Sequence, residues 1–93
     1  MRFHVYLIIA KIRSKYISYV GYTRDINKRI LLHNSSKGAK FTKGNKWFVI
    51  YKKSYTSKSK AMKEEYKLKK NYLLRTKIKK KFINNENFNI TSI

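Results

Sequence analysis

Two apolar segments near the start of the chain limit its fold more than any other feature. The first runs from Phe3 to Ile12, and the second, rich in Tyr, Ile and Val, runs from Tyr16 to Tyr22. Only the polar segment Arg13–Lys15 separates them. Two such segments joined by so short a connection predict a β-hairpin. No Asn-Gly or Asp-Gly pair marks the turn, so the sequence leaves the register of this hairpin open.

The residues after the hairpin predict a helix and then a third strand. Gly21 closes the second strand, and Thr23 or Asp25 is a suitable N-cap for a helix that ends near Asn34. The β-branched and aromatic residues of Lys46–Tyr51 favour a strand. We therefore expect an α/β domain.

The second half of the chain predicts further helices. Thr56 or Ser57 can cap a helix of about fifteen residues, whose apolar stripe includes Ala61, Leu68 and Tyr72. A short helix is predicted over 76–82. The composition then turns to Asn, Thr and Ser, which indicates a domain over residues 1–83 and a frayed tail over 84–93.

The charge of the chain indicates its partner. Lys and Arg number 24 and Asp and Glu only 4, so 93 residues carry a net charge of +20. Such a chain is drawn to polyanions, because each phosphate that it neutralises releases counterions. Nucleic acid is therefore the first partner to consider. No segment is long enough to cross a membrane, and we expect an intracellular protein, in the cytoplasm or associated with the nucleoid.

The absence of cysteine and the small number of acidic residues exclude several kinds of site. Without cysteine there is no disulfide scaffold, thiol nucleophile or Cys-ligated zinc. A two-metal hydrolase surrounds its ions with several carboxylates, and this chain has only Asp25, Glu64, Glu65 and Glu86. We expect a site for one metal ion at most.

A small set of residues is placed where chemistry could occur. A two-residue hairpin loop would bring Tyr6 and Tyr19 diagonally together on one face of the sheet. Arg29 precedes His33 by one helical turn. Glu65 lies on the apolar stripe of its helix, where a carboxylate needs a cation, a metal or several hydrogen-bond donors. An ion pair with Lys58, Lys69 or Arg29 is the simpler alternative for Glu65, and tyrosines in a hairpin are more often packing residues.

The segment from Ser35 to Asn45 predicts a basic loop. It is either an ordinary solvated loop or a loop whose lysines bind a nucleic-acid backbone and whose aromatic rings stack on unpaired bases. The residues of the second interpretation are Lys37, Lys40, Phe41, Lys43 and Lys46, with Trp47 beside them.

Between Phe3 and Lys70, short motifs follow one another in a characteristic order. They are Val5-Tyr6, Tyr19-Val20-Gly21, Thr23, Asp25, Arg29, His33-Asn34, Lys37-Gly38-Ala39-Lys40-Phe41-Thr42 and Ala61 with Glu65-Tyr66. This order resembles the GIY-YIG nuclease superfamily, most closely its small single-domain branch. The specificity of the match comes from the ordered set rather than from any one tripeptide. His4 is a departure, because it stands where the first motif of the superfamily has glycine.

The resemblance implies a three-stranded antiparallel sheet flanked by helices. It also implies an endonuclease that hydrolyses phosphodiester bonds in DNA with one divalent ion, Mg²⁺ or Mn²⁺. Tyr6 and Tyr19 would be the motif tyrosines, Arg29 would contact the phosphate and Glu65 would hold the metal. His33 would help a tyrosine to take a proton from water.

Several alternatives stay open at this stage. A non-catalytic nucleic-acid binding module would keep the same fold and charge, and an RNA-associated structural protein would need the lysines alone. DNA is the expected substrate, with RNA as the alternative, and we expect recognition of shape rather than sequence. The exposed strands of so small a domain leave room for a homodimer or a protein partner.

Overall fold

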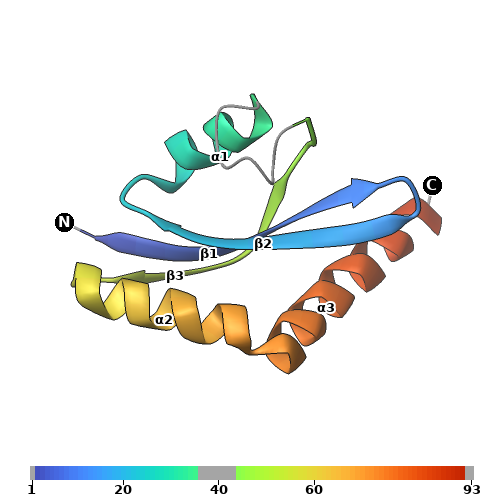
Figure 1. The fold of residues 1–93 in the computed structure, drawn as a ribbon. Helices are drawn as coiled ribbons and strands as arrows, with labels where there is room; N and C mark the ends of the chain where they lie inside the picture. The colour runs from blue at the N-terminus through green and yellow to red at the C-terminus, as the bar shows by residue number, and fades with distance from the viewer. Residues whose placement is uncertain (1, 36–43, 92–93) are drawn as a thin grey trace.

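The fold is a three-stranded sheet with helices on both faces. The computed structural model describes residues 2–35 and 44–91, with side chains through residue 84. Its elements are β1 (Phe3–Ile12), β2 (Lys15–Thr23), α1 (Ile26–Asn34), β3 (Phe48–Tyr55), α2 (Lys58–Lys70) and α3 (Tyr72–Thr91). The strands pair antiparallel in the order β2-β1-β3. Helix α1 lies on one side of this sheet and α2 and α3 on the other (Figure 1), which confirms the predicted α/β class.

The hairpin has the two-residue loop on which the placement of the tyrosines depended. Ile12 pairs with Lys15, so the loop consists of Arg13, at a positive φ of 59°, and Ser14. The same register places Tyr6 opposite Gly21 and Ile8 opposite Tyr19. Residues directly opposite each other point to the same face of a sheet, so Tyr6 and Tyr19 do lie diagonally on one face.

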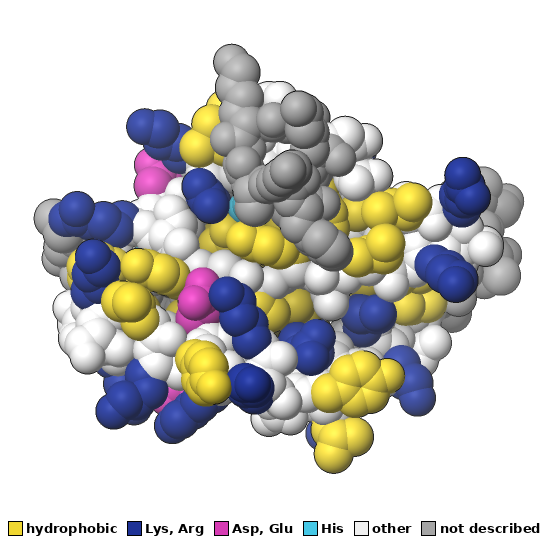
Figure 2. Space-filling view, viewed as in Figure 1, with side chains coloured by type: hydrophobic (Ala, Val, Ile, Leu, Met, Phe, Trp, Pro, Cys, Tyr) yellow, Lys and Arg dark blue, Asp and Glu magenta, His cyan; other side chains and the backbone are white. Residues whose placement is uncertain are grey.

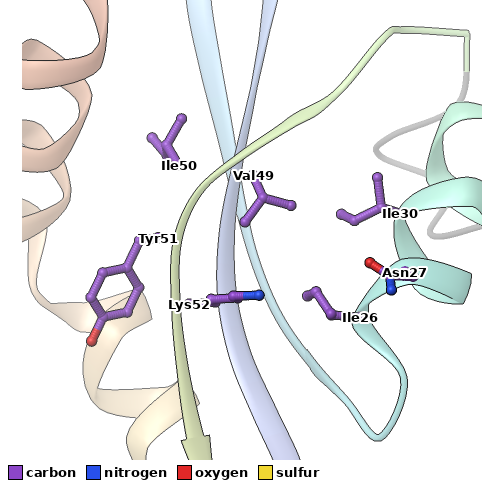
Figure 3. Close-up of a pocket in the computed structure, with 7 residues that line it drawn as sticks. All are labelled: Ile26, Asn27, Ile30, Val49, Ile50, Tyr51 and Lys52. Carbon is purple, nitrogen blue, oxygen red and sulfur yellow. The ribbon is translucent and has the colours of Figure 1, made fainter.

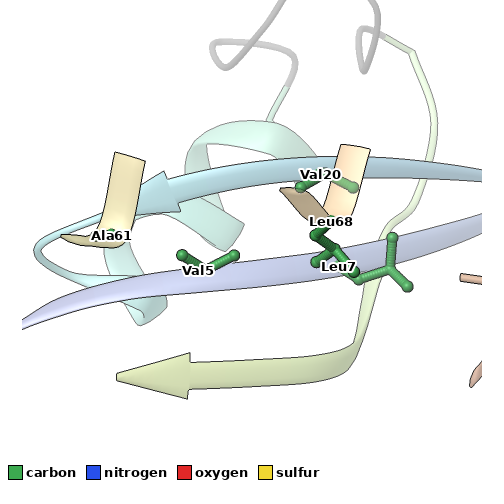
Figure 4. Close-up of a cluster of buried hydrophobic side chains, with 5 residues drawn as sticks. All are labelled: Val5, Leu7, Val20, Ala61 and Leu68. Carbon is green, nitrogen blue, oxygen red and sulfur yellow. The ribbon is translucent and has the colours of Figure 1, made fainter. Parts of the chain in front are cut away.

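Strand β1 supplies the cores on both sides of the sheet. On the side of α2, Val5 and Leu7 pack with Val20, Ala61 and Leu68 (Figure 4). On the side of α1, the buried side chains are Tyr6, Ile8, Ala10 and Trp47, with Ile17, Tyr19, Ile26 and Ile30 packed against them. Burial on both faces explains why the first apolar segment does not alternate with polar residues.

Side-chain caps set the start of two helices, as the sequence predicted. The Asp25 carboxylate accepts a hydrogen bond from the Lys28 backbone N–H at 3.1 Å, and the Ser57 hydroxyl accepts one from the Lys60 N–H at 3.2 Å. Each bond satisfies a backbone donor that the first helical turn leaves without a partner.

Other boundaries differ from the predictions. Strand β3 starts after the buried Trp47 and extends four residues beyond Tyr51, because it continues to pair with β1 as far as Phe3. Helix α3 is far longer than the predicted 76–82. The Asn71 side chain accepts from the Leu74 N–H at 3.1 Å at its start, and no glycine or proline follows to end it.

Two expectations about the surface can also be compared with the structure. Tyr72 was predicted on the apolar stripe of α2 but is 68% exposed, because α2 ends before it. Within the described residues, none of the helices has the length and apolar character to cross a membrane.

Candidate functional site

The Tyr6 hydroxyl is the centre of a polar cluster beneath α1. Tyr6 and His33 are both fully buried. The Tyr6 oxygen lies 2.9 Å from Nε2 of His33, and Nε of Arg29 donates a hydrogen bond to the same oxygen at 3.4 Å. The four-residue spacing of Arg29 and His33 along α1 thus aims both side chains at one atom of β1.

The chemistry of these groups indicates where the protons lie. A guanidinium can only donate, so the Tyr6 oxygen accepts from Arg29. Burial, together with the positive charge of Arg29, lowers the pKa of His33 below 6.5, which keeps the imidazole neutral at pH 7. The neutral tautomer that carries its proton on Nδ1 can accept the Tyr6 proton at Nε2. Burial raises the pKa of Tyr6 against the opposing effect of Arg29, so the hydroxyl stays protonated.

Tyr19 completes the cluster from the neighbouring strand. Its half-buried ring makes an edge contact with the His33 ring, with centroids 5.4 Å apart, and the Tyr6 and His33 centroids are 5.9 Å apart. The hydrogen bond to Tyr6 is the main cause of a raised pKa of Arg29, and Tyr19 adds to it. The structure thus brings Tyr6, Tyr19, Arg29 and His33 together, and we call these four residues the tyrosine cluster.

Gly21 is required by the position of the Tyr6 ring. A Cβ atom at residue 21 would lie 2.6 Å from Cζ of Tyr6 and nearer still to its hydroxyl oxygen. Any side chain at this position would overlap the ring. The glycine that ends the second motif therefore makes room for the tyrosine of the first.

Glu65 lies on α2, on the other side of the sheet from α1 (Figure 1). Its side chain is only 17% exposed, and its carboxylate is 3.6 Å from Nζ of Lys69. Burial is the largest cause of the raised pKa of Tyr6, and the negative charge of Glu65 is the last of several further contributions to it. The neighbouring Glu64, whose side chain is 22% exposed, pairs with Lys60 at 3.3 Å and with Lys67 at 3.5 Å.

The described residues contain no preformed metal site. Within the described residues, no three His, Cys, Asp or Glu side chains gather in a way that could hold a metal. Mg²⁺ needs fewer protein ligands, because it is commonly bound through one or two carboxylates together with water and substrate phosphate. Glu65, with a single long ion pair, is suited to be that one carboxylate.

Asn34 has a role that the sequence analysis missed. Its amide oxygen accepts from the Trp47 N–H at 2.6 Å, and its amide nitrogen donates to the Trp47 carbonyl at 3.2 Å. These bonds tie the end of α1 to the residue before β3 and so help to hold His33 in place. Its position beside His33 in the motif was the only available signal.

The remaining candidates make other contacts or lie outside the described residues. His4 pairs with the Ser54 hydroxyl at 2.8 Å, and the Lys46 ammonium stands 5.5 Å from the centre of the Phe48 ring. Four predicted nucleic-acid contacts lie outside the described residues: Lys37, Lys40, Phe41 and Lys43.

One groove in the described part of the chain lies away from the Tyr6 hydroxyl. It measures about 530 Å³ and lies between α1 and β3 (Figure 3). A bulge in β3 leaves Ile50 without a partner on β1 and turns Val49 and Lys52 to the side of α1. Ile26 and Ile30 form its opposite wall. This groove holds no acid or histidine, so we do not place the reaction there.

Lysines and arginines are frequent on the surface of the molecule. Figure 2 shows them scattered among hydrophobic and neutral side chains on the face in view, with few acidic side chains. The cluster of tyrosines, arginine and histidine is therefore set in a strongly positive field, as the net charge of +20 requires.

Comparison with known proteins identifies close relatives of the chain. The family model of the GIY-YIG catalytic domain matches residues 2–84. A UPF0213 protein of Staphylococcus epidermidis is 46% identical over 52 residues, which are 55% of this chain and 63% of that protein. A UPF0213 protein of Oceanobacillus iheyensis is 42% identical over 65 residues, 69% of this chain and 74% of the relative.

A solved structure is also similar. The solution NMR structure of a UPF0213 protein from Bacillus halodurans is 37% identical in sequence, with a TM-score of 0.42. The similarity covers 74% of this chain and 71% of that one.

Proposed function

The chain belongs to the GIY-YIG catalytic domain family, and we propose that it is a divalent-metal-dependent endonuclease that hydrolyses phosphodiester bonds in DNA. The family implies nuclease activity in general. The observation that carries the finer proposal is the Tyr6 hydroxyl held between Arg29 and a buried neutral His33.

Tyr6 and His33 form a path for a proton. The phenol oxygen has two lone pairs, of which Arg29 occupies one. As the water oxygen forms its bond to phosphorus, the second lone pair takes a proton from that water, and the proton of Tyr6 passes to Nε2 of His33. The bond from phosphorus to the leaving oxygen breaks, and its electron pair stays on that oxygen, which takes a proton from solvent. Coupling the two transfers avoids a free phenolate, which the raised pKa of Tyr6 makes costly.

Arg29 and Glu65 supply the electrostatic part of the mechanism. The N–H groups of Arg29 other than Nε can donate to non-bridging phosphate oxygens, where negative charge gathers in the transition state. Glu65 would hold one Mg²⁺ or Mn²⁺ ion, which would stabilise that same charge when bound. Lys69 pairs with Glu65 in the resting protein and would release it to the metal.

Recognition in this proposal depends on the shape of the DNA rather than its sequence. The cations around the site are lysines and arginines suited to phosphates, and phosphate contacts position a nucleic acid without reading its bases. RNA is the alternative substrate, and a homodimer or a protein partner could add the selectivity that this chain lacks.

A cleavage assay with a matched pair of variants tests the proposal. Labelled duplex, single-stranded and branched DNA are incubated with the protein and Mg²⁺ or EDTA. We expect EDTA and Glu65→Gln to abolish cleavage. Glu64→Gln should retain it, because this neighbouring carboxylate pairs only with Lys60 and Lys67 in the described structure.

The other outcomes separate the alternatives. Cleavage that persists in EDTA and in Glu65→Gln would remove the metal and its ligand from the mechanism. Tight binding of every DNA without any cut strand would favour the non-catalytic binding module instead.

A further inference from the structure

Two smaller grooves flank the candidate site. The first measures about 470 Å³ and the second about 360 Å³. Each includes one residue of the tyrosine cluster, Arg29 in the first and Tyr19 in the second. The first groove is lined by Phe3, Tyr22, Thr23, Arg24, Arg29 and Lys58, and the second by Ser18, Tyr19, Val20, Lys69 and Arg75.

Both grooves lie along the outer edge of β2. This strand is at one end of the described sheet and pairs only with β1. Successive residues of a strand point to opposite faces, yet Tyr19 lines the second groove together with Ser18 and Val20. Each groove therefore reaches around the edge, from the side of α1 to the side of α2.

The order of residues places the site between the two grooves. Along β2, Ser18, Tyr19 and Val20 line the second groove, and Tyr22 and Thr23 line the first. Gly21 lies between these two sets of residues. Helix α2 packs against β2 and runs the other way, with Lys58 in the first groove and Lys69 in the second. Glu65 lies between these two lysines, about 10 Å along the helix from Lys58.

The arginines of the grooves are already oriented. The Arg24 guanidinium stands 5.6 Å from the centre of the Phe3 ring. Arg75 donates from Nε to the Leu68 carbonyl at 3.1 Å and lies over the Tyr72 ring at 5.8 Å. Side chains held in this way lose less conformational entropy when they bind a phosphate. Among the described residues that line the two grooves, none is acidic.

We propose that the edge of β2 is a track for one nucleic-acid strand, held by its phosphates on both sides of the bond that is cut. Arg24 and Lys58 bind the backbone in the first groove, and Lys69 and Arg75 bind it in the second. The strand passes Arg29 and Glu65 between them. This proposal rests on the proposed function, because it takes the tyrosine cluster as the point of cleavage.

The test measures binding without cleavage. All variants carry Glu65→Gln and are kept in EDTA, so a missing activity cannot affect the result. The affinity for a single-stranded DNA oligonucleotide is measured by fluorescence anisotropy over a range of salt concentrations. The first groove is tested with Arg24→Gln/Lys58→Gln and the second with Lys69→Gln/Arg75→Gln. The control is Lys53→Gln/Lys63→Gln, which removes the same charge from exposed lysines outside both grooves.

We expect each groove variant to bind about tenfold more weakly at low salt, whereas the control changes about twofold. The slope of log affinity against log salt should fall by about 0.7 for each lost phosphate contact on a single strand. Because Arg75→Gln removes a hydrogen bond to Leu68, Lys69→Gln alone serves as a second variant for that groove. Lys69 is half exposed, so its replacement should leave the fold intact.

Three results would overturn the track. Equal losses in the groove variants and the control would show that only the diffuse charge matters. A loss confined to one groove would exclude a strand held on both sides. Tight binding of duplex with no measurable binding of a single strand would exclude a single-strand track. Groove-dependent binding by a wild-type protein that never cuts DNA with Mg²⁺ would instead refute the proposed function and leave the binding surface in place.

Discussion

Replacing Gly21 with alanine is the most direct test of how the site is built. The added Cβ would lie 2.6 Å from Cζ of Tyr6, whereas non-bonded carbon atoms prefer about 3.5–4.0 Å. The overlap is therefore about 1 Å. The Tyr6 ring cannot move aside freely, because it is fully buried and its hydroxyl bonds to His33 and Arg29.

The expected cost combines overpacking with the loss of these hydrogen bonds. Overpacking a well-filled core costs about 1–3 kcal/mol, and a hydrogen bond to a charged group contributes about 1.5–3 kcal/mol. The smaller backbone entropy of unfolded alanine returns about 0.4–1 kcal/mol. We expect Gly21→Ala to lower the free energy of unfolding by about 2–5 kcal/mol, and Tm by about 10 °C or more in a domain of this size.

Urea unfolding and thermal melting followed by circular dichroism measure this effect. Gly44→Ala is the matched control, because a Cβ there would meet no atom within 4 Å. Its cost should come from the positive φ of 83° alone, about 1 kcal/mol. In a Tyr6→Leu background, which removes the overlapping ring, Gly21→Ala should cost less than about 1 kcal/mol.

Two results would refute the reasoning. If Gly21→Ala lost no more stability than Gly44→Ala, the packing of the Tyr6 ring would not require glycine at position 21. An undiminished loss in the Tyr6→Leu background would show that the substitution acts through something other than the Tyr6 ring.

Four further predictions concern single residues. Arg29→Gln should lower the single-turnover cleavage rate by about 10²-fold or more with a smaller loss of DNA affinity, and equal losses would make Arg29 a phosphate anchor only. Because burial lowers the pKa of His33 below 6.5, the unfolded chain binds this proton more readily, so Tm should fall as pH drops below 6.5. The fall should be smaller in His33→Gln, and equal slopes would contradict this cause. Asn34→Ala should cost about 1–3 kcal/mol of stability in urea unfolding, because it removes both hydrogen bonds between the Asn34 side chain and the Trp47 backbone. An unchanged stability would show that these two bonds do not hold α1 to the start of β3. Arg13→Gly should stabilise the hairpin by about 1 kcal/mol through its positive φ, and a lower Tm would contradict it.

Local patterns in the sequence predicted much of the fold. The hairpin, the caps at Asp25 and Ser57 and the starts of two helices follow from residues within a few positions of one another. The ends of β3 and α3 did not follow. Strand β3 continues because β1 is beside it, and α3 continues because nothing in its own sequence stops it.

Some features of the candidate site could also be predicted from local sequence patterns, and others could not. Helical spacing alone placed Arg29 and His33 on one side of α1, and the apolar stripe placed Glu65 toward the sheet. The roles of these residues stay predictions. The two hydrogen bonds between the Asn34 side chain and the Trp47 backbone could not be predicted from the sequence. They join residues thirteen positions apart, and the sequence between these residues has no regular pattern.

The class of fold, the family and the residue types available for chemistry could be inferred from the chain alone, because periodicity, caps and motif order are local properties. That Tyr6 lies opposite Gly21, and that its hydroxyl contacts His33 and Arg29, became apparent only from the three-dimensional fold. Strand register and helix docking are set by packing between distant segments. A shift of one residue in the hairpin would have turned Tyr6 and Tyr19 to opposite faces of the sheet.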